Sequence, residues 1–152
     1  MLLIHGVIHT MEDETYADGF VQVNGDKIQD VGDMARFSGS VGDAIDLKGA
    51  HVYPGFIDAH THLGMCEDGL GFEGEDVNEE THPLTPQLRA VDAGNFLDDC
   101  FKEAAAAGIT TVLTGPGSAN PIGGQWVAMK TVGRSMEDMT IREQIGMKFA
   151  FG

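Results

Sequence analysis

Cysteine is scarce in this sequence, which contains only Cys66 and Cys100. The two lie far apart and match neither a CxxC redox pair nor the paired spacing of a zinc knuckle. Their scarcity excludes a disulfide-rich secreted scaffold and favours free thiols in a reducing compartment. We therefore expect a cytoplasmic protein without a structural disulfide.

Basic residues are also few. The chain has 9 lysines and arginines against 24 acidic residues, and its formal net charge is -15. Such an excess of negative charge opposes binding to a phosphate backbone or to an anionic membrane surface. We therefore expect no nucleic acid and no membrane among the partners.

Long apolar runs are missing as well. No segment approaches the roughly 18 to 20 apolar residues that span a bilayer. Residues 1–6 lack the basic region and long apolar region of an export signal. The hydrophobic content of 42% over 152 residues is ordinary for a globular domain, so the sequence predicts a folded, soluble, non-exported protein.

Short strands are predicted throughout the first fifty residues. Their approximate ranges are 2–10, 19–23, 27–31, 44–47 and 51–53. Asn24-Gly25-Asp26 predicts a tight antiparallel hairpin, because Asn-Gly readily adopts the positive φ angles that such a turn needs. Lys48-Gly49 predicts a turn between the last two strands. This part of the chain is therefore expected to form a small β layer.

From Pro54 onward the pattern changes to alternating strand and helix. A short apolar run at 56–60 leads into a loop rich in glycine and acidic residues at 64–80. Asn95 is placed to cap a helix over 96–107, which Gly108 would end. The face of this helix that should be buried carries Phe96, Cys100, Phe101 and Ala104.

A β-branched run at 109–114 predicts a buried strand after this helix. The order strand, helix, strand is a βαβ unit, which favours a parallel sheet with its chemistry at the carboxyl ends of the strands. Another apolar stretch follows at 125–131. Residues 145–152 predict one more buried strand, and a parallel sheet ending there would need another polypeptide segment to cover it.

His60 and His62 are the residues most able to carry chemistry. Positions i and i+2 of a strand point to the same face, so both imidazoles can reach one metal ion. Imidazole nitrogen suits zinc and related metals, although His-x-His also accepts iron, manganese or nickel. Asp58 lies two residues earlier on the same face and could orient a ligand histidine.

The run PGFIDAHTHLG at residues 54–64 resembles the first barrel strand of the amidohydrolase superfamily. The VNGDKI hairpin before it and AAAAGITTVL after it match the same pattern. The resemblance implies an α/β fold with a small N-terminal β-sandwich layer over 1–53. Residues 54–152 would then be the first strands and helices of a (β/α)8 TIM-like barrel, incomplete in this chain because a whole barrel takes roughly 200 to 250 residues.

For function, the resemblance implies a hydrolase that cleaves amide or cyclic-amide carbon-nitrogen bonds through a metal-bound hydroxide. His60 and His62 would be the first two ligands of a centre with one or two divalent ions, most simply zinc. Two further histidines and the catalytic aspartate are expected outside this chain, which alone should be inactive. We expect a homo-oligomer when the protein is complete. The stretch GITTVLTGPGSANPIGG is similar to the imidazolonepropionase-related branch.

Two other interpretations stay open. The same first strand occurs in ring aminohydrolases, or deaminases, of the superfamily. The chain could also be a non-catalytic metal-binding or scaffold fragment that works only with a complementary chain.

Four further residues are weaker candidates. Lys148 lies in an apolar stretch and could be a bridging ligand, or it could point to the outer face of the sheet. The loop at 115–124 lacks a Walker lysine, which excludes a nucleotide cradle. Ser118, Asn120 and Gln125 could contact substrate there, or belong to an ordinary connection.

Overall fold

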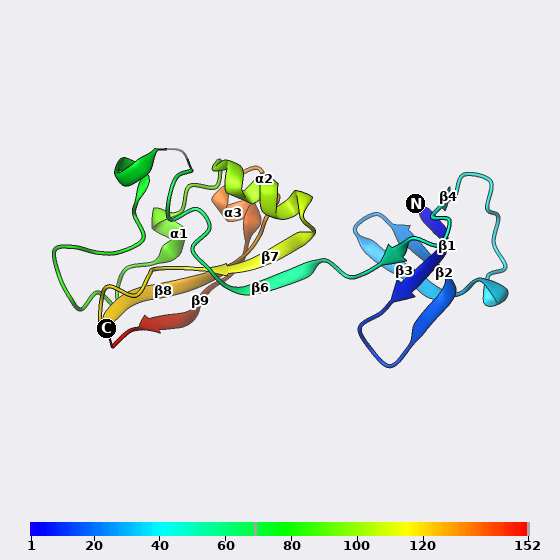
Figure 1. Ribbon diagram of the computed structural model, residues 1–152, viewed down its shortest axis with the longest axis horizontal. Helices are drawn as coiled ribbons and strands as arrows, with labels where there is room; N and C mark the ends of the chain where they lie inside the picture. The colour runs from blue at the N-terminus through cyan, green and yellow to red at the C-terminus, as the bar shows by residue number, and fades with distance from the viewer. Residues whose placement is uncertain (69, 152) are drawn as a thin grey trace. The chain divides into compact units, whose positions relative to one another are not determined.

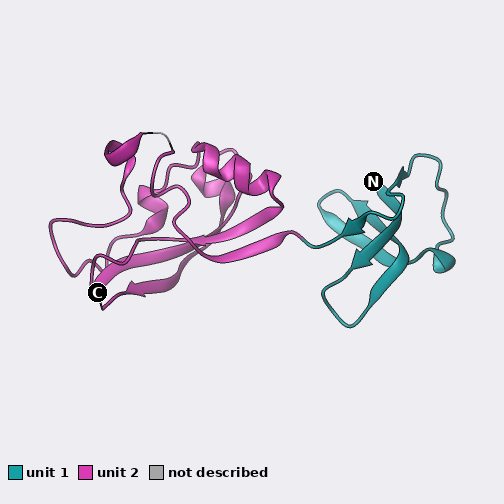
Figure 2. Ribbon diagram, in the orientation of Figure 1, with its two compact units in different colours: residues 1–54 teal, residues 55–152 magenta. Residues whose placement is uncertain are grey.

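The computed structural model describes residues 1–68 and 70–151. The chain divides into two compact units, Met1–Pro54 and Gly55–Gly152 (Figures 1 and 2). The division falls where the sequence changes from short strands to alternating strand and helix. Within the described residues no helix is both long enough and apolar enough to cross a membrane.

The first unit is a single five-stranded sheet. Its elements are β1 (Leu2–His9), β2 (Thr15–Asn24), β3 (Lys27–Asp33), the 3₁₀ helix η1 (Met34–Arg36), β4 (Ile45–Asp46) and β5 (His51–Val52). The order is β3-β2-β1-β4, and β5 also pairs with β1. The predicted hairpin is confirmed, since β2 and β3 are antiparallel, Asn24 pairs with Lys27, and Gly25 has φ +61°.

The two short strands β4 and β5 do not pair with each other. Each runs parallel to β1, at Leu3–Ile4 and at Val7–Ile8 respectively. The predicted turn between them is present, with positive φ at both Lys48 and Gly49. The second sheet of a sandwich stays a prediction, because the described part of this unit forms one sheet around a small core. That core contains Ile4, Ile8, Phe20 and Val21.

The second unit is built on a four-stranded sheet in the order β6-β7-β8-β9. The strands are β6 (Phe56–Thr61), β7 (Ile109–Thr114), β8 (Ile122–Lys130) and β9 (Thr140–Phe149). The short helices are η2 (Gly71–Gly74), α1 (Ala90–Ala93), α2 (Asp99–Ala106) and α3 (Met136–Met139). The βαβ prediction is confirmed, because β6 and β7 are parallel and α2 lies between them in the chain.

The prediction of a parallel sheet is wrong beyond β7. Strand β8 is antiparallel to β7, and β9 is antiparallel to β8. The physical reason is the length of the connections. Residues 115–121 and 131–139 are each shorter than the dozen or so residues that a parallel crossover needs.

The predicted helix over 96–107 is shorter than expected. Helix α2 starts at Asp99, after Asp98 at its N-cap. Asn95 caps the preceding turn instead, where its Oδ1 accepts a hydrogen bond from the Leu97 amide at 3.0 Å. The predicted buried face is confirmed by Phe101, and Gly108 ends the helix region with φ +86°.

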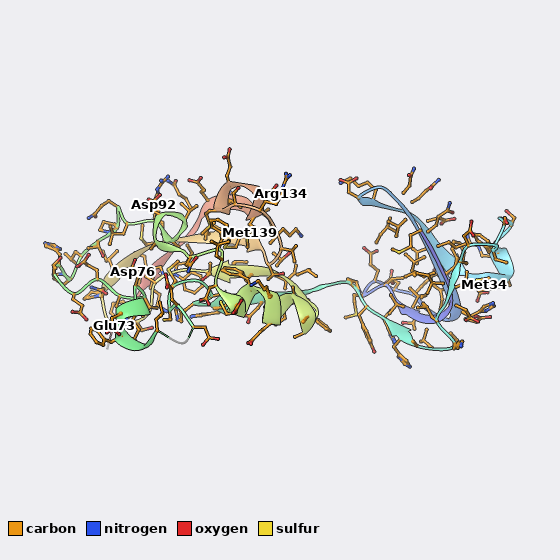
Figure 3. All side chains as sticks on the ribbon, turned by 90° about the horizontal axis from the view of Figure 1, so that it is seen from above. Met34, Glu73, Asp76, Asp92, Arg134 and Met139 are labelled. Carbon is orange, nitrogen blue, oxygen red and sulfur yellow. The ribbon has the colours of Figure 1, made fainter. Side chains whose placement is uncertain are left out.

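The hydrophobic core of the second unit lies between the sheet and its helices. It contains Met65, Ala90, Phe101, Val112, Val127, Met129 and Met139. Met139 is 1% exposed and lies within the unit in Figure 3, whereas the Arg134 side chain extends outward. This core holds the central strands β7 and β8 in place.

Strand β9 differs from the buried strand predicted at 145–152. It begins at Thr140, ends at Phe149 and occupies one edge of the sheet. Its apolar side chains are exposed, with Ile145 at 39% and Phe149 at 57%. An apolar edge strand without a covering layer is unfavourable in water, so this surface is suited to further packing.

Candidate metal centre

His60 and His62 lie together at the carboxyl end of β6. Their ring centroids are 5.7 Å apart and the rings are perpendicular. The i, i+2 spacing thus brings two imidazoles to one place. Figure 1 shows that β6 runs beside β7, so the carboxyl ends of both strands meet here.

His62 is fixed by a main-chain hydrogen bond. Its Nδ1 lies 2.6 Å from the carbonyl oxygen of Gly115, the residue that follows β7. A carbonyl can only accept, so Nδ1 carries the proton and donates. In the neutral ring Nε2 then keeps its lone pair, which is the form that binds a metal.

Asp58 contacts the main chain of the histidine strand. Its Oδ1 accepts a hydrogen bond from the His60 amide at 3.1 Å. In this structure Asp58 therefore restrains the backbone at His60. Orientation of a ligand imidazole by Asp58 stays a prediction.

Trp126 on β8 packs against both histidines. This contact was not predicted from the sequence. Its ring centroid lies 4.8 Å from that of His60 and 5.8 Å from that of His62. The Lys148 ammonium lies 5.6 Å from the same ring, within the range of a cation-π contact. A lone tryptophan in an apolar stretch predicts only a buried strand, so no local pattern pointed to this contact.

The three predicted substrate-contact residues have different surroundings. Ser118 is exposed. Asn120 is buried and its Nδ2 donates to the carbonyls of Glu79 and His82, which ties two loops together. Gln125 Nε2 donates to the Pro86 carbonyl. These bonds give Asn120 and Gln125 a structural role, and contact with substrate stays a prediction.

The donor set near the histidines is incomplete. Among residues 1–68 and 70–151, no group of three or more histidine, cysteine, aspartate or glutamate side chains could hold a metal ion. Two imidazoles, of which His62 has Nδ1 bonded to a carbonyl, fit a first-row divalent metal as part of its coordination shell.

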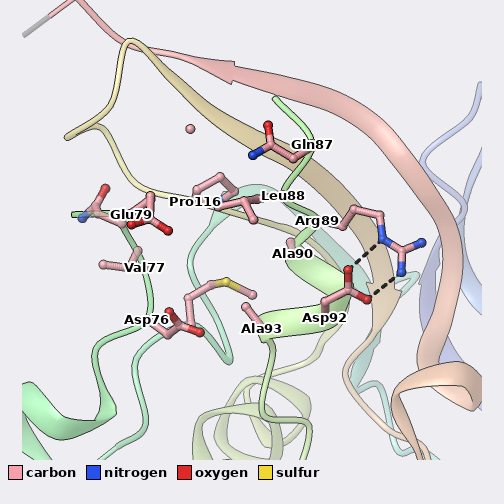
Figure 4. Close-up of a pocket in the computed structure, with 13 residues that line it drawn as sticks. Asp76, Val77, Glu79, Gln87, Leu88, Arg89, Ala90, Asp92, Ala93 and Pro116 are labelled. Carbon is pink, nitrogen blue, oxygen red and sulfur yellow. Dashed lines mark hydrogen bonds and ion pairs between the residues drawn. The ribbon is translucent and has the colours of Figure 1, made fainter. Parts of the chain in front are cut away.

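A pocket of about 290 Å³ lies elsewhere in the second unit (Figure 4). The loop at 76–79 and the segment at 87–93 line most of it, and neither His60 nor His62 does. Arg89 forms ion pairs with Asp92 at 2.6 Å and with Glu143 at 3.1 Å. The Arg89 guanidinium lowers the pKa of the Asp92 carboxyl through their hydrogen bonds. The arginine is thus already neutralised and the lining is acidic.

Both cysteines are free thiols, as predicted. Burial raises the pKa of Cys100 to about 11, with the hydrogen bond to Asp98 acting in the same direction. Burial also raises the pKa of Cys66. Neither thiol is therefore suited to nucleophilic catalysis near neutral pH.

No family model matches the chain. It is 38% identical over 96 residues to amidohydrolase tasK of Hapsidospora irregularis, a match covering 60% of this chain and 10% of that protein. It is 34% identical over 67 residues to 5'-deoxyadenosine deaminase of Methanococcoides burtonii, covering 43% of this chain and 15% of that protein.

A solved structure, an amidohydrolase from Thermotoga maritima MSB8, superposes with a TM-score of 0.90 at 35% identity. This match covers 99% of the chain but 39% of the Thermotoga protein. The chain thus spans well under half of each of these relatives. Two of these three proteins are named amidohydrolases, and this similarity supports the resemblance to the amidohydrolase superfamily.

Proposed function

We propose that this chain supplies the first two metal ligands, His60 and His62, of a metal-dependent hydrolase acting on amide or cyclic-amide bonds. The observation that carries the proposal is the hydrogen bond from His62 Nδ1 to Gly115, which leaves Nε2 free beside the His60 ring. Similarity to an amidohydrolase over most of the chain supports the same reaction class.

The residues of this chain would act by holding and orienting. A divalent metal, most simply zinc, would supply Lewis acidity toward water and toward the carbonyl of the bond to be cleaved. His60 and His62 would bind one or two such ions together with ligands from outside the chain. The aspartate that moves the proton would also lie outside it. Lys148 is a further candidate ligand, since it contacts the ring that touches both histidines.

We further propose that β6 and β7 are the first two strands of a TIM-like barrel, preceded by a β-sandwich layer over 1–53. Their parallel pairing and the position of both histidines at a carboxyl end support this, because barrel enzymes place their chemistry there. Within the superfamily, we propose that the protein belongs to the imidazolonepropionase-related branch. We also propose that it is cytoplasmic and forms a homo-oligomer.

A ring aminohydrolase is the second candidate function. The similarity to a protein named 5'-deoxyadenosine deaminase favours it. The two activities differ in their products, because a deaminase releases ammonia from an aminopurine and an amidohydrolase releases an amine and a carboxylate. A non-catalytic scaffold would do neither.

The test is to assay metal content and hydrolysis together. The complete wild-type protein, with the ligands and the aspartate expected outside this chain, should contain a divalent metal and either hydrolyse an amide or cyclic amide or deaminate an aminopurine from a substrate panel. The His60→Ala and His62→Ala variants should lose both. His5→Ala is the matched control, since His5 lies in the first unit and bonds to Asp18. Wild-type metal content in the double variant would refute the proposal.

A further inference from the structure

Trp126 is the only tryptophan of the chain and is 8% exposed. Its ring meets His60 at an interplanar angle of 81° and His62 at 66°. Edge-to-face packing is a preferred arrangement of aromatic rings, so each imidazole has a defined orientation against the indole. A single side chain therefore restrains both candidate ligands.

Trp126 also packs on the backbone that fixes His62. A Cβ atom at position 115 would lie 2.5 Å from both Cδ1 and Cγ of the indole, so only glycine permits this approach. The carbonyl of the same glycine accepts the His62 hydrogen bond. The indole thus limits the movement of the imidazole and of its acceptor together.

The indole is placed by packing and not by its polar atom. Nε1 is buried and has no hydrogen-bond partner among the described residues. Burying an unpaired N–H is unfavourable, so the contacts of the ring must outweigh that cost. Those contacts include His60, His62, the Gly115 backbone and Lys148.

We propose that Trp126 is the positioning residue of the His60 and His62 pair, holding both imidazoles in a ligand-ready arrangement before metal arrives. This inference rests on the proposed metal site for its effect on metal binding, whereas the ring contacts themselves are present in the structure. Residues that orient ligand histidines change metal affinity by about 10- to 100-fold when they are replaced.

The experiment uses the complete protein, including the ligands expected outside this chain, with ¹³C-labelled histidine and with cobalt(II) as the metal. NMR of the metal-free wild type should show contacts from indole protons to both imidazoles, and Trp126→Ala should shift both sets of histidine resonances. Cobalt binding should weaken about 10- to 100-fold in Trp126→Ala, and the d–d absorption bands should change shape. Trp126→Phe keeps an aromatic edge, so it should retain most of the cobalt affinity and most of the wild-type shape of the d–d bands.

Met129→Ala is the control, because Met129 is fully buried on the same strand but belongs to the core. It should lower stability without changing the cobalt spectrum. Unchanged affinity and spectrum in Trp126→Ala, or an equal effect of Met129→Ala, would overturn the inference. If indole-to-imidazole contacts are present but the wild type takes up no cobalt, the positioning role stands and the proposed function fails.

Discussion

At the scale of single residues, the candidate centre depends on contacts between strands. His60 lies on β6 and His62 directly after it, Gly115 directly follows β7, and Trp126 lies on β8. Each restrains the next through a ring contact or a hydrogen bond. A substitution at any one of these positions should therefore change the orientation of the two imidazoles.

Gly115→Ala should destabilise the second unit by about 1–3 kcal/mol, the usual cost of overpacking a filled site. The new methyl group would overlap the Trp126 ring, which must then move away from both imidazoles. Urea unfolding measures the loss. Gly146→Ala is the control, since nothing lies within 4 Å of its Cβ position. Equal stability of the two variants would contradict the close packing at Gly115.

Cys100 should make the protein lose stability between about pH 9 and pH 11. Burial raises its pKa to about 11 in the folded chain, above the ordinary thiol value of 9.0. The unfolded thiol releases its proton first, so the stabilisation is complete below pH 9 and declines as the pH rises toward 11. Chemical denaturation across this range should show a smaller decline in Cys100→Ala. Identical slopes in the two proteins would rule out the raised pKa.

The sequence predicted part of the centre because part of it is local. The i, i+2 spacing of His60 and His62 follows from strand geometry alone. The contacts of Trp126 and the acceptor at Gly115 depend on the register of β6, β7 and β8, which joins residues more than fifty positions apart. Local pattern carries no information on that register.

At the scale of elements, α2 and the central strands hold the site in place. Helix α2 buries Phe101 against Val112 and its core neighbours, and β7 ends at the Gly115 carbonyl. Strands with β-branched runs were predictable, whereas the direction of β8 and β9 was not. Strand composition does not reveal the pairing partner, and only the short connections indicate antiparallel neighbours.

Phe101→Ala should cost about 3–5 kcal/mol of unfolding free energy, because it leaves a cavity under the sheet. Leu97→Ala is the comparison, since Leu97 is 69% exposed and its loss should change stability by less than about 0.5 kcal/mol. Both are measured from denaturant midpoints. Similar midpoints for the two variants would show that α2 does not pack as described.

At the scale of the whole chain, the exposed apolar strand β9 is the main feature still requiring a partner. Ile141, Ile145 and Phe149 are all exposed along this edge. Their exposure accords with a chain that spans 39% of the Thermotoga protein it superposes on. In the proposed barrel, further strands would bury this surface.

The isolated 152-residue chain should therefore self-associate as its concentration rises. Replacing Ile145 and Phe149 with lysine should reduce the association, because charge on an edge strand opposes pairing with another chain. Sedimentation velocity measures both proteins. Ile28→Lys in the first unit, also at an exposed position, should leave the association unchanged. A wild-type chain that stays monomeric at every concentration would contradict this view of β9.

The proposed function depends on metal binding by His60 and His62. The most direct measurement is an anomalous difference map from crystals of the metal-loaded protein, collected at the absorption edge of the bound metal. We expect a peak within bonding distance of Nε2 of His62 and of a ring nitrogen of His60. A metal-loaded crystal with its anomalous peaks elsewhere, and none at these two rings, would contradict it.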